Sequence, residues 1–506
     1  MRIGGLASGI DTDSIIKDLM KAERIPLDKM EQDKTKLEWQ RDAFRDVNKS
    51  MLELDNMMLD MKMSKTYNSK SVTSTMEGAV TATGTASSTN GTYNIKVEQL
   101  ATSAINVSGA IKIDSSEKLA GQTMGNGEEI IADETLFSFK TFDEAGVAKT
   151  YEYTIGADET LKDVIDRVNT DDNNVRMTFD NNTNKIIMET TRTGKYNPAV
   201  DGKEIVFENA TFLKEALNIH QGNEDGGENA IFTYNNNYRV ENSRENNYTL
   251  NGITFQFNNT TKDSSGVAQN ATLTVNNDVD ASFDKIMAFV DKYNEVVETL
   301  NGSQQEERYR DFPPLTDAQR EEMSDNEIEL WEEKAKSGLL KGESSISSGL
   351  FDMRQSWYST VDTGGGQYTS LTQIGIATSS DYLDGGKLIV NEEELRAALS
   401  EDPASVQKLF SNSETGDQRG LVNRLEDSLE RTMDKINQRA GKGTDTLENY
   451  TLGKRMKDLD SRISAFEDRL TQVQDRYWRQ FSAMEQAISA MNQQSSMLMS
   501  NFGGGQ

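Results

Sequence analysis

A seven-residue repeat of apolar side chains near the C-terminus constrains this chain more than any other feature. From Met456 to Leu498 the repeat alternates steps of three and four residues, and the positions between are mostly polar. This spacing places the apolar side chains on one narrow stripe of a helix, which is typical of a left-handed coiled coil. At 1.5 Å per residue the helix is roughly 64 Å long, more than one globular core requires. The segment therefore needs partner helices.

A second, weaker repeat begins near the N-terminus, so the two ends of the chain can pair with each other. Ordinary apolar faces of a globular bundle are the alternative interpretation, but the narrowness of the C-terminal stripe favours a coiled coil. The side chains expected to make the coiled-coil and assembly contacts are Ile16, Leu19, Met30, Leu37, Phe44, Met51, Met456, Leu459, Ile463, Phe466, Leu470, Val473, Tyr477, Met484, Met491 and Leu498.

The stripe changes character toward the C-terminal end. Gln480 and Gln494 weaken it, while Phe481 and Ile488 begin a second apolar stripe beside it. A helix with two adjacent stripes is typical of an assembly of several helices rather than a simple pair. This end of the chain is therefore expected to meet other subunits.

Length and charge limit the classes of function. A chain of 506 residues is too long for a single core, so several domains are expected. The net charge of −29 repels nucleic acid and anionic membranes, which argues against binding to either. No run of 18 apolar residues predicts a membrane-spanning helix.

The inventory of reactive side chains argues against catalysis. Cysteine is absent and His220 is the single histidine, which excludes thiolate chemistry and sites built from paired histidines. Asp11 and Asp13 are better explained as the start of a helix than as metal ligands. No phosphate-binding loop is present. The sequence therefore predicts no enzyme and no catalytic, cofactor or metal site.

Periodicity divides the chain into a nested arrangement. A helix is expected from Asp13, with Pro26 kinking or restarting it, and the helical period returns at Phe283. Alternating strand patterns with two short helices fill the interval, and an insert of about residues 87–280 is expected to fold on its own. The predicted fold class is α+β and multidomain, with a terminal coiled coil formed by the N- and C-terminal segments, a helical or mixed domain, and inserted β-rich domains.

Four domains follow from these changes of pattern. Their expected ranges are 1–45 with 445–506 for the terminal coiled coil, 46–85 with 283–444 for a helical domain containing a β-hairpin, 86–120 with 240–282 for a β-rich domain, and 121–239 for an outer β-rich domain with short helices.

Several separated motifs carry a resemblance to a known family. The residues 5–16 (GLASGIDTDSII), 91–101 (GTYNIKVEQLA), 368–376 (YTSLTQIGI) and the tail 481–485 (FSAME) with 491–496 (MNQQSS) stand in the order that the family shows. The chain resembles the flagellar filament-capping proteins, the FliD family or flagellar hook-associated protein 2, and the resemblance covers nearly its whole length.

The resemblance implies a structural function outside the cell. It implies a homo-oligomeric cap at the tip of the bacterial flagellum, which promotes polymerisation of exported flagellin and prevents its loss. The implied partners are flagellin, hook–filament junction proteins and an export chaperone. The first residues lack the apolar core of a signal peptide, and the resemblance explains this by export through the flagellar type III apparatus without cleavage.

Two alternatives belong to other classes of function. A surface adhesin would use the β-rich insert to bind host or matrix glycans, and a glycan-binding assay would separate it from a cap. An exported hydrolase is the third interpretation, and the shortage of nucleophile and histidine chemistry argues against it.

Overall fold

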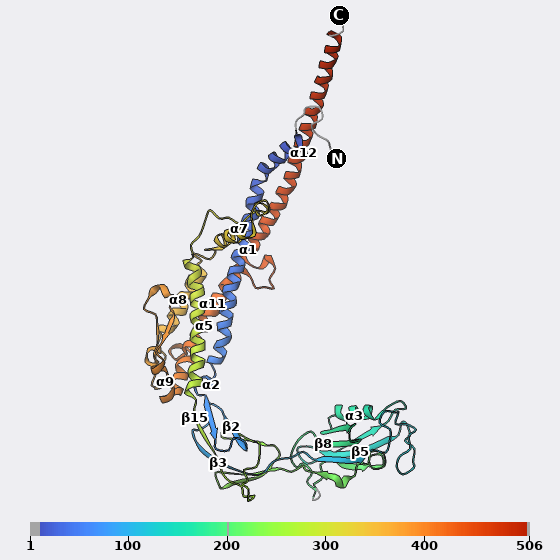
Figure 1. The fold of residues 1–506 in the computed structure, drawn as a ribbon. Coiled ribbons are helices and arrows are strands. Elements are labelled where there is room, and N and C mark those ends of the chain that lie inside the picture. The colour runs from blue at the N-terminus through green and yellow to red at the C-terminus, as the bar shows by residue number, and fades with distance from the viewer. Residues whose placement is uncertain (1–10, 200–201, 503–506) are drawn as a thin grey trace. The chain divides into compact units, whose positions relative to one another are not determined.

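The computed structural model describes residues 11–199 and 202–502, and the chain divides into two compact units. The helical unit comprises the chain up to Tyr67 and from Val279 onward, and the β unit comprises Asn68–Asp278. Figure 1 shows the long helices of the first and the sheets of the second. The expected α+β multidomain class is confirmed.

Ten α-helices and a hairpin make up the described part of the helical unit. The helices are α1 (Thr12–Met61), α2 (Ser64–Tyr67), α5 (Val279–Gln305), α6 (Asp317–Glu321), α7 (Asp325–Lys336), α8 (Ser344–Tyr358), α9 (Glu392–Glu401), α10 (Pro403–Ser411), α11 (Leu421–Ala440) and α12 (Thr451–Phe502). Short 3-10 turns are η2 (Leu371–Ile374), η3 (Tyr382–Asp384), η4 (Gly416–Gln418) and η5 (Leu447–Asn449). The expected hairpin pairs β16 (Ile376–Thr378) with β17 (Leu388–Val390) in antiparallel register.

Helix α1 runs without interruption through Pro26, so the expected restart of the helix at this residue is wrong. The Asp11 carboxylate caps the helix by accepting a hydrogen bond from the Ser14 amide at 3.0 Å. Pro26 lacks an amide donor, but the next residue, Leu27, is almost fully buried. Packing of the helix therefore outweighs the one missing hydrogen bond.

The helical core lies where the C-terminal half of α1 packs with α5, α8 and α11. Phe44 on α1, Tyr293 on α5 and Trp357 on α8 are buried in one cluster. The Tyr293 and Trp357 rings meet edge to face, with centroids 5.4 Å apart. The Tyr293 hydroxyl donates to the Gly386 carbonyl at 3.2 Å, which ties the hairpin to this core. Burial of such large rings anchors the helices from which α1 and α12 extend.

The β unit contains two hydrophobic cores. The first β core lies between a sheet of order β1-β15-β3-β11-β12 and a sheet of order β13-β14-β2. Its strands are β1 (Lys70–Ser74), β2 (Val80–Gly84), β3 (Gly91–Gln99), β11 (Ala230–Tyr234), β12 (Tyr238–Ser243), β13 (Asn247–Leu250), β14 (Ile253–Phe257) and β15 (Ala271–Asn277). Inward residues such as Ile95, Phe255 and Leu273 alternate with more exposed ones, as the strand pattern predicted.

The second β core combines two sheets with two helices. Its sheets have the orders β10-β4-β8-β7 and β6-β5-β9. The elements are β4 (Ile105–Ala110), β5 (Thr135–Phe142), β6 (Ala148–Thr154), α3 (Leu161–Thr170), β7 (Val175–Asp180), β8 (Lys185–Thr190), β9 (Val206–Asn209), α4 (Thr211–Glu215), η1 (Gln221–Asn223) and β10 (Glu224–Asp225). Phe137, Phe139, Tyr153 and Phe212 form an aromatic centre.

Strand pairing places several segments differently from the expected domain ranges. Residues 68–85 belong to the β unit and not to the helices, because β1 pairs with β15 and β2 pairs with β14. Likewise β11 pairs with β3 in the first core, whereas β4 pairs with β8 in the second. The chain therefore passes from the first β core to the second near residue 104 and returns to the first near residue 229. The expected boundaries were near residues 120 and 239. Alternation is the same in both cores, so only pairing partners reveal which sheet a strand joins.

Two linkers, residues 100–104 and 226–229, join the β cores, and the loop after β8 adds a third connection. In that loop the Thr193 hydroxyl donates to the Arg244 carbonyl at 2.6 Å. The Gly194 amide donates to the Thr102 carbonyl at 3.1 Å. Gly194 has a φ of +93°, and a Cβ there would lie 2.5 Å from the Arg244 Cα, so the close approach requires glycine.

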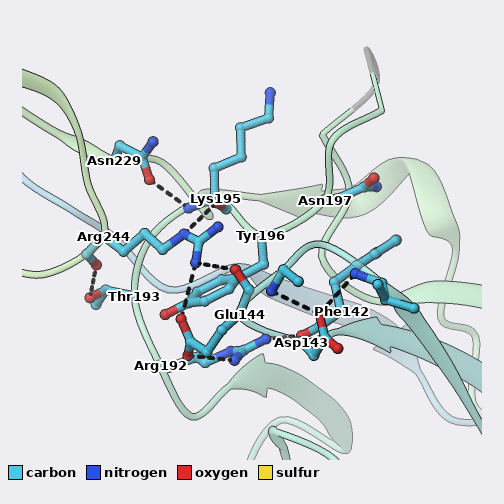
Figure 2. Close-up of polar contacts among 12 residues, drawn as sticks. Phe142, Asp143, Glu144, Arg192, Thr193, Lys195, Tyr196, Asn197, Asn229 and Arg244 are labelled. Carbon is cyan, nitrogen blue, oxygen red and sulfur yellow. Dashed lines mark hydrogen bonds and ion pairs between the residues drawn. The ribbon is translucent and has the colours of Figure 1, made fainter.

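Arg244 closes this junction by a clamp of four side chains, Glu144, Arg192, Tyr196 and Arg244 (Figure 2). The Tyr196 ring lies between two guanidinium groups, with the Cζ atoms of Arg192 and Arg244 at 3.5 and 4.1 Å from its centroid. Arg192 and Arg244 each donate to the Glu144 carboxylate, at 3.3 and 3.0 Å. Arg244 is the member from the first core, so the clamp holds the two cores together.

Candidate functional site on the terminal helices

Helices α1 and α12 pack side by side in antiparallel directions (Figure 1). The Lys34 ammonium lies 2.6 Å from the Asp460 carboxylate, and farther along the pair the Tyr477 hydroxyl donates to Glu23 at 3.0 Å. The expected pairing of the two terminal segments is therefore confirmed. Because the helices come from opposite ends of the chain, residues that meet across the pair are separated by more than 400 positions in the sequence.

The predicted stripe is more buried in the first half of α12 than at its C-terminal end. Met456 is 1% exposed and Val473 6% exposed, whereas Met491 and Leu498 are 62% and 57% exposed. Of the other predicted α12 residues, Leu459 is buried, Ile463, Phe466, Leu470 and Tyr477 are half-buried, and Met484 is exposed. The first turns of α12 thus pack against the helical core, whereas its last turns expose apolar side chains to water.

On α1 the predicted stripe is buried at both ends and looser in the middle. Ile16, Phe44 and Met51 are buried, Met30 and Leu37 are half-buried, and Leu19 is exposed. The structure therefore brings most of the predicted residues to the α1/α12 seam or to the helical core, and leaves Leu19, Met484, Met491 and Leu498 uncovered. Their part in assembly remains a prediction.

Among the described residues, α1 does not extend alongside the last turns of α12. Glu23 lies opposite Tyr477. Only about three turns of α1 precede Glu23, because the helix begins at Thr12. Past about residue 488, α12 has no helix opposite it among the residues that the structure describes. Met491, Met497, Leu498 and Met499 are exposed there. An exposed run of large apolar side chains on one helix marks a contact surface for another chain.

The seam also contains a groove that sequence reasoning missed. A cavity of about 460 Å³ lies between the two helices, where Ile16, Met20 and Leu27 of α1 meet Leu470 and Trp478 of α12. Leu27 is 1% exposed, although it follows the proline at which a break was expected. The spacing of four and then seven residues from Ile16 to Leu27 was the signal that could have found it. The groove fits an apolar side chain.

Charged side chains border the seam and stabilise it weakly. A hydrogen bond to Asp460 raises the pKa of Lys34. Burial raises the pKa of Glu31, and Arg24 opposes this shift. Since these groups are partly in water, each pair adds little to stability and depends on salt. The apolar stripe therefore supplies most of the pairing energy.

The described ranges offer no other kind of site of the sorts considered from the sequence. Within residues 11–199 and 202–502, no three acidic or histidine side chains gather where they could hold a metal ion. His220 is exposed, with its Nε2 atom 3.2 Å from the Asn218 side-chain oxygen. No described helix is both long and apolar enough to cross a membrane.

Comparison with known proteins covers both ends of the chain. The family model described as the flagellar hook-associated protein 2 N-terminus matches residues 8–104, and the model of the corresponding C-terminus matches residues 227–493. Flagellar hook-associated protein 2 of Halalkalibacterium halodurans is 40% identical, over 99% of this chain and all of the relative. The Thermotoga maritima protein of the same description is 23% identical over 98% of this chain and 95% of its own.

A solved structure has a similar fold. The D1-D2-D3 domains of the Escherichia coli flagellar cap protein FliD superimpose with a TM-score of 0.54 at 17% identity, covering 83% of this chain and 99% of that one. At this identity the likeness concerns the fold.

Proposed function

This chain belongs to the flagellar hook-associated protein 2 family, and from that premise we propose how its terminal helices act in the filament cap. The protein is a structural component of the bacterial flagellum and works outside the cell, at the distal tip of the filament. There it promotes ordered polymerisation of flagellin and prevents its loss. The uncovered apolar end of α12 is the observation that carries the mechanism below.

Several copies form an annular cap in which the paired terminal helices serve as legs. In a single chain the last turns of α12 expose Met491, Leu498 and their neighbours to water. Burial of apolar surface favours contact with other subunits, at about 25 cal/mol per Å². A leg whose end is bound only by such contacts can release and re-engage as flagellin subunits are added. The mixed helical and β domains, apart from these legs, form the plate beneath which flagellin is guided.

The partners follow from this position. The cap is a homo-oligomer that associates with flagellin, and hook–filament junction proteins and an export chaperone complete the set. Export through the flagellar type III apparatus takes the chain to the tip. The glycan-adhesin alternative draws no support from the comparisons, which all point to flagellar proteins.

The protein is not an enzyme in this proposal. Its family is structural, and its side chains include one histidine and no cysteine. A hydrolase or transferase activity that disappears when one Asp, Glu or Ser is replaced, with the fold intact, would contradict this.

A deletion and complementation experiment tests the function. Cells lacking this chain should release flagellin monomers into the medium and carry no full-length filaments. The full-length chain should restore filaments, and a chain ending at residue 488 should be exported but restore few. Electron microscopy of filament length and immunoblots of the medium provide the two readouts. Filaments of normal length in the deletion strain would overturn the proposal.

A further inference from the structure

A basic cleft lies where α1 and α12 leave the helical body. Its volume is about 600 Å³, and its apolar lining consists of Leu37, Leu339 and Leu459. The cations around it outnumber the acids Asp33, Glu343 and Asp458 by two to one, although the whole chain carries a charge of −29. These cations are Lys36, Arg308, Lys341, Lys454, Arg455 and Arg462.

The acids of the cleft are largely engaged already. Glu343 accepts from Arg439 at 2.9 Å and from Gln40 at 3.0 Å. Asp458 pairs loosely with Arg462, at 3.8 Å. Within the part of the chain that the structure describes, the remaining five cations have side chains with no ion pair or hydrogen bond inside the protein. An acidic protein thus gathers five cationic side chains that make no ion pair or hydrogen bond among the described residues, and Asp33 offsets only part of their charge.

The crowding of positive charge has a measurable consequence at Lys36. Partial burial and the nearby Arg308 both lower the pKa of this lysine, and Asp33 only partly opposes them. A bound carboxylate would relieve this repulsion. Because Leu37, Leu339 and Leu459 line the same cavity, a ligand that combines carboxylates with an apolar side chain fits better than a small inorganic anion.

Helix α7 displays a surface of this composition. Asp325, Glu329 and Glu333 recur every four residues, so they lie along one face, and all three are exposed. Leu330 beside them is 54% exposed. We call these four residues the acidic face of α7. The Trp331 indole donates to the Pro313 carbonyl at 2.8 Å, which anchors the helix to its own chain while Leu330 stays uncovered.

We propose that the basic cleft of one copy binds the acidic face of α7 of a second copy. The contact is head to tail, because two different surfaces meet, and such contacts close into rings when the rotation between copies permits. It uses the helix-in-groove mode, in which an apolar anchor enters a groove and flanking charges fix the register. This inference rests on the proposed function, which requires several copies, and it names the surfaces that hold them.

Charge reversal in the full-length protein tests the contact. The cleft variant Lys454→Glu/Arg455→Glu changes exposed α12 side chains, and the α7 variant Glu329→Lys/Glu333→Lys changes exposed side chains of the acidic face. Sedimentation velocity at low salt should show association weakened at least about tenfold in each variant. A chain carrying both reversals should recover most of the affinity, since the charges are again opposite. The matched control Lys162→Glu/Lys214→Glu has the same charge change on the β unit and should associate like the wild type.

Three outcomes contradict the inference: cleft variants that associate normally, a combined variant no better than either single one, or a wild-type chain that stays monomeric at every concentration. Circular dichroism melting of each variant verifies that it is folded. Filament assembly in cells separates this inference from the proposed function. If the deletion strain lacks filaments but the reversed variants build normal ones, only the contact is wrong; normal filaments in the deletion strain would refute the function itself.

Discussion

Leu470 lies half-buried in the groove between α1 and α12. In Leu470→Asp an unpaired charge would enter this groove, at a cost of about 2 kcal/mol or more to the pairing of the two helices. We expect the β unit and the helical core to stay folded, because neither contains this residue. Cells carrying the variant should export it normally yet secrete flagellin monomers instead of building filaments.

Gln472→Asp is the matched control for this prediction. Gln472 is exposed on α12, so the same charge remains in water and filament assembly should proceed. Filaments of ordinary length in cells exporting Leu470→Asp would refute the leg mechanism.

Glu224 in the second β core should make stability depend on pH. Its carboxylate accepts from the Glu204 amide at 2.6 Å, but burial still raises its pKa from 4.5 to about 7, with Glu204 adding repulsion and Lys203 opposing. The folded protein therefore keeps a proton that the unfolded chain releases near pH 4.5. The retained proton therefore stabilises the folded protein at low pH. This contribution to the free energy of unfolding, on the order of 3 kcal/mol, is lost as the pH rises through about 7.

Glu224→Gln should remove that dependence. Between pH 5 and pH 8, denaturant unfolding of the wild type should lose stability relative to the variant, and the two curves should differ most at the higher pH. Glu152→Gln, at an exposed position on β6, should follow the wild type. Parallel curves for wild type and Glu224→Gln would show that the carboxylate is ionised in the fold.

At the scale of elements, α12 should be ordered unequally in an isolated subunit. Its first turns, from Met456 to Val473, pack on α1 or the body, whereas the turns after residue 488 have no described helix opposite them. Unpacked helix is marginal in water. Hydrogen exchange should be slow in the first segment and fast in the last turns, and should slow there on assembly. Equal protection along α12 in the monomer would contradict this.

The clamp around Tyr196 should govern movement between the two β cores. Arg244→Ala removes one face of the stacked arrangement and the bond to Glu144, which together contribute about 1–3 kcal/mol. Proteinase K should then cut the linkers at residues 100–104 and 226–229 several times faster. Arg239→Ala is the control, since that arginine pairs only with Glu98 and Glu241, both on strands of the first core. Unchanged cleavage would mean that the linkers alone hold the cores.

At the scale of the whole molecule, the β unit should fold without the helices. Residues 68–278 contain both β cores and every sheet partner of their strands. Expressed alone, this segment should unfold cooperatively on heating. The shorter segment 87–280 is an informative comparison, because it lacks β1 and β2 and leaves β14 and β15 without partners on one side. It should melt at a lower temperature, and equal melting would show that these two strands add nothing.

Features that depend on local periodicity can be predicted from the order of residues alone. The stripe from Met456 to Val473 predicts a long helix because side chains at steps of three and four must share one face, whatever the rest of the chain does. The nested order of helices, strands and helices follows for the same reason, and the family motifs at 5–16 and 91–101 identify the protein. How far the stripe acts in assembly remains a prediction.

Tertiary structure decided everything that depends on which distant segments meet. Pro26 does not end α1, because burial of Leu27 and pairing with α12 outweigh a local preference. β11 joins the first β core rather than the second, since strands of equal alternation are distinguished only by their partners. The clamp around Tyr196 and the basic cleft assemble from residues dozens to hundreds of positions apart. A single sequence constrains neighbours along the chain, whereas such sites exist only once folding sets the long-range contacts.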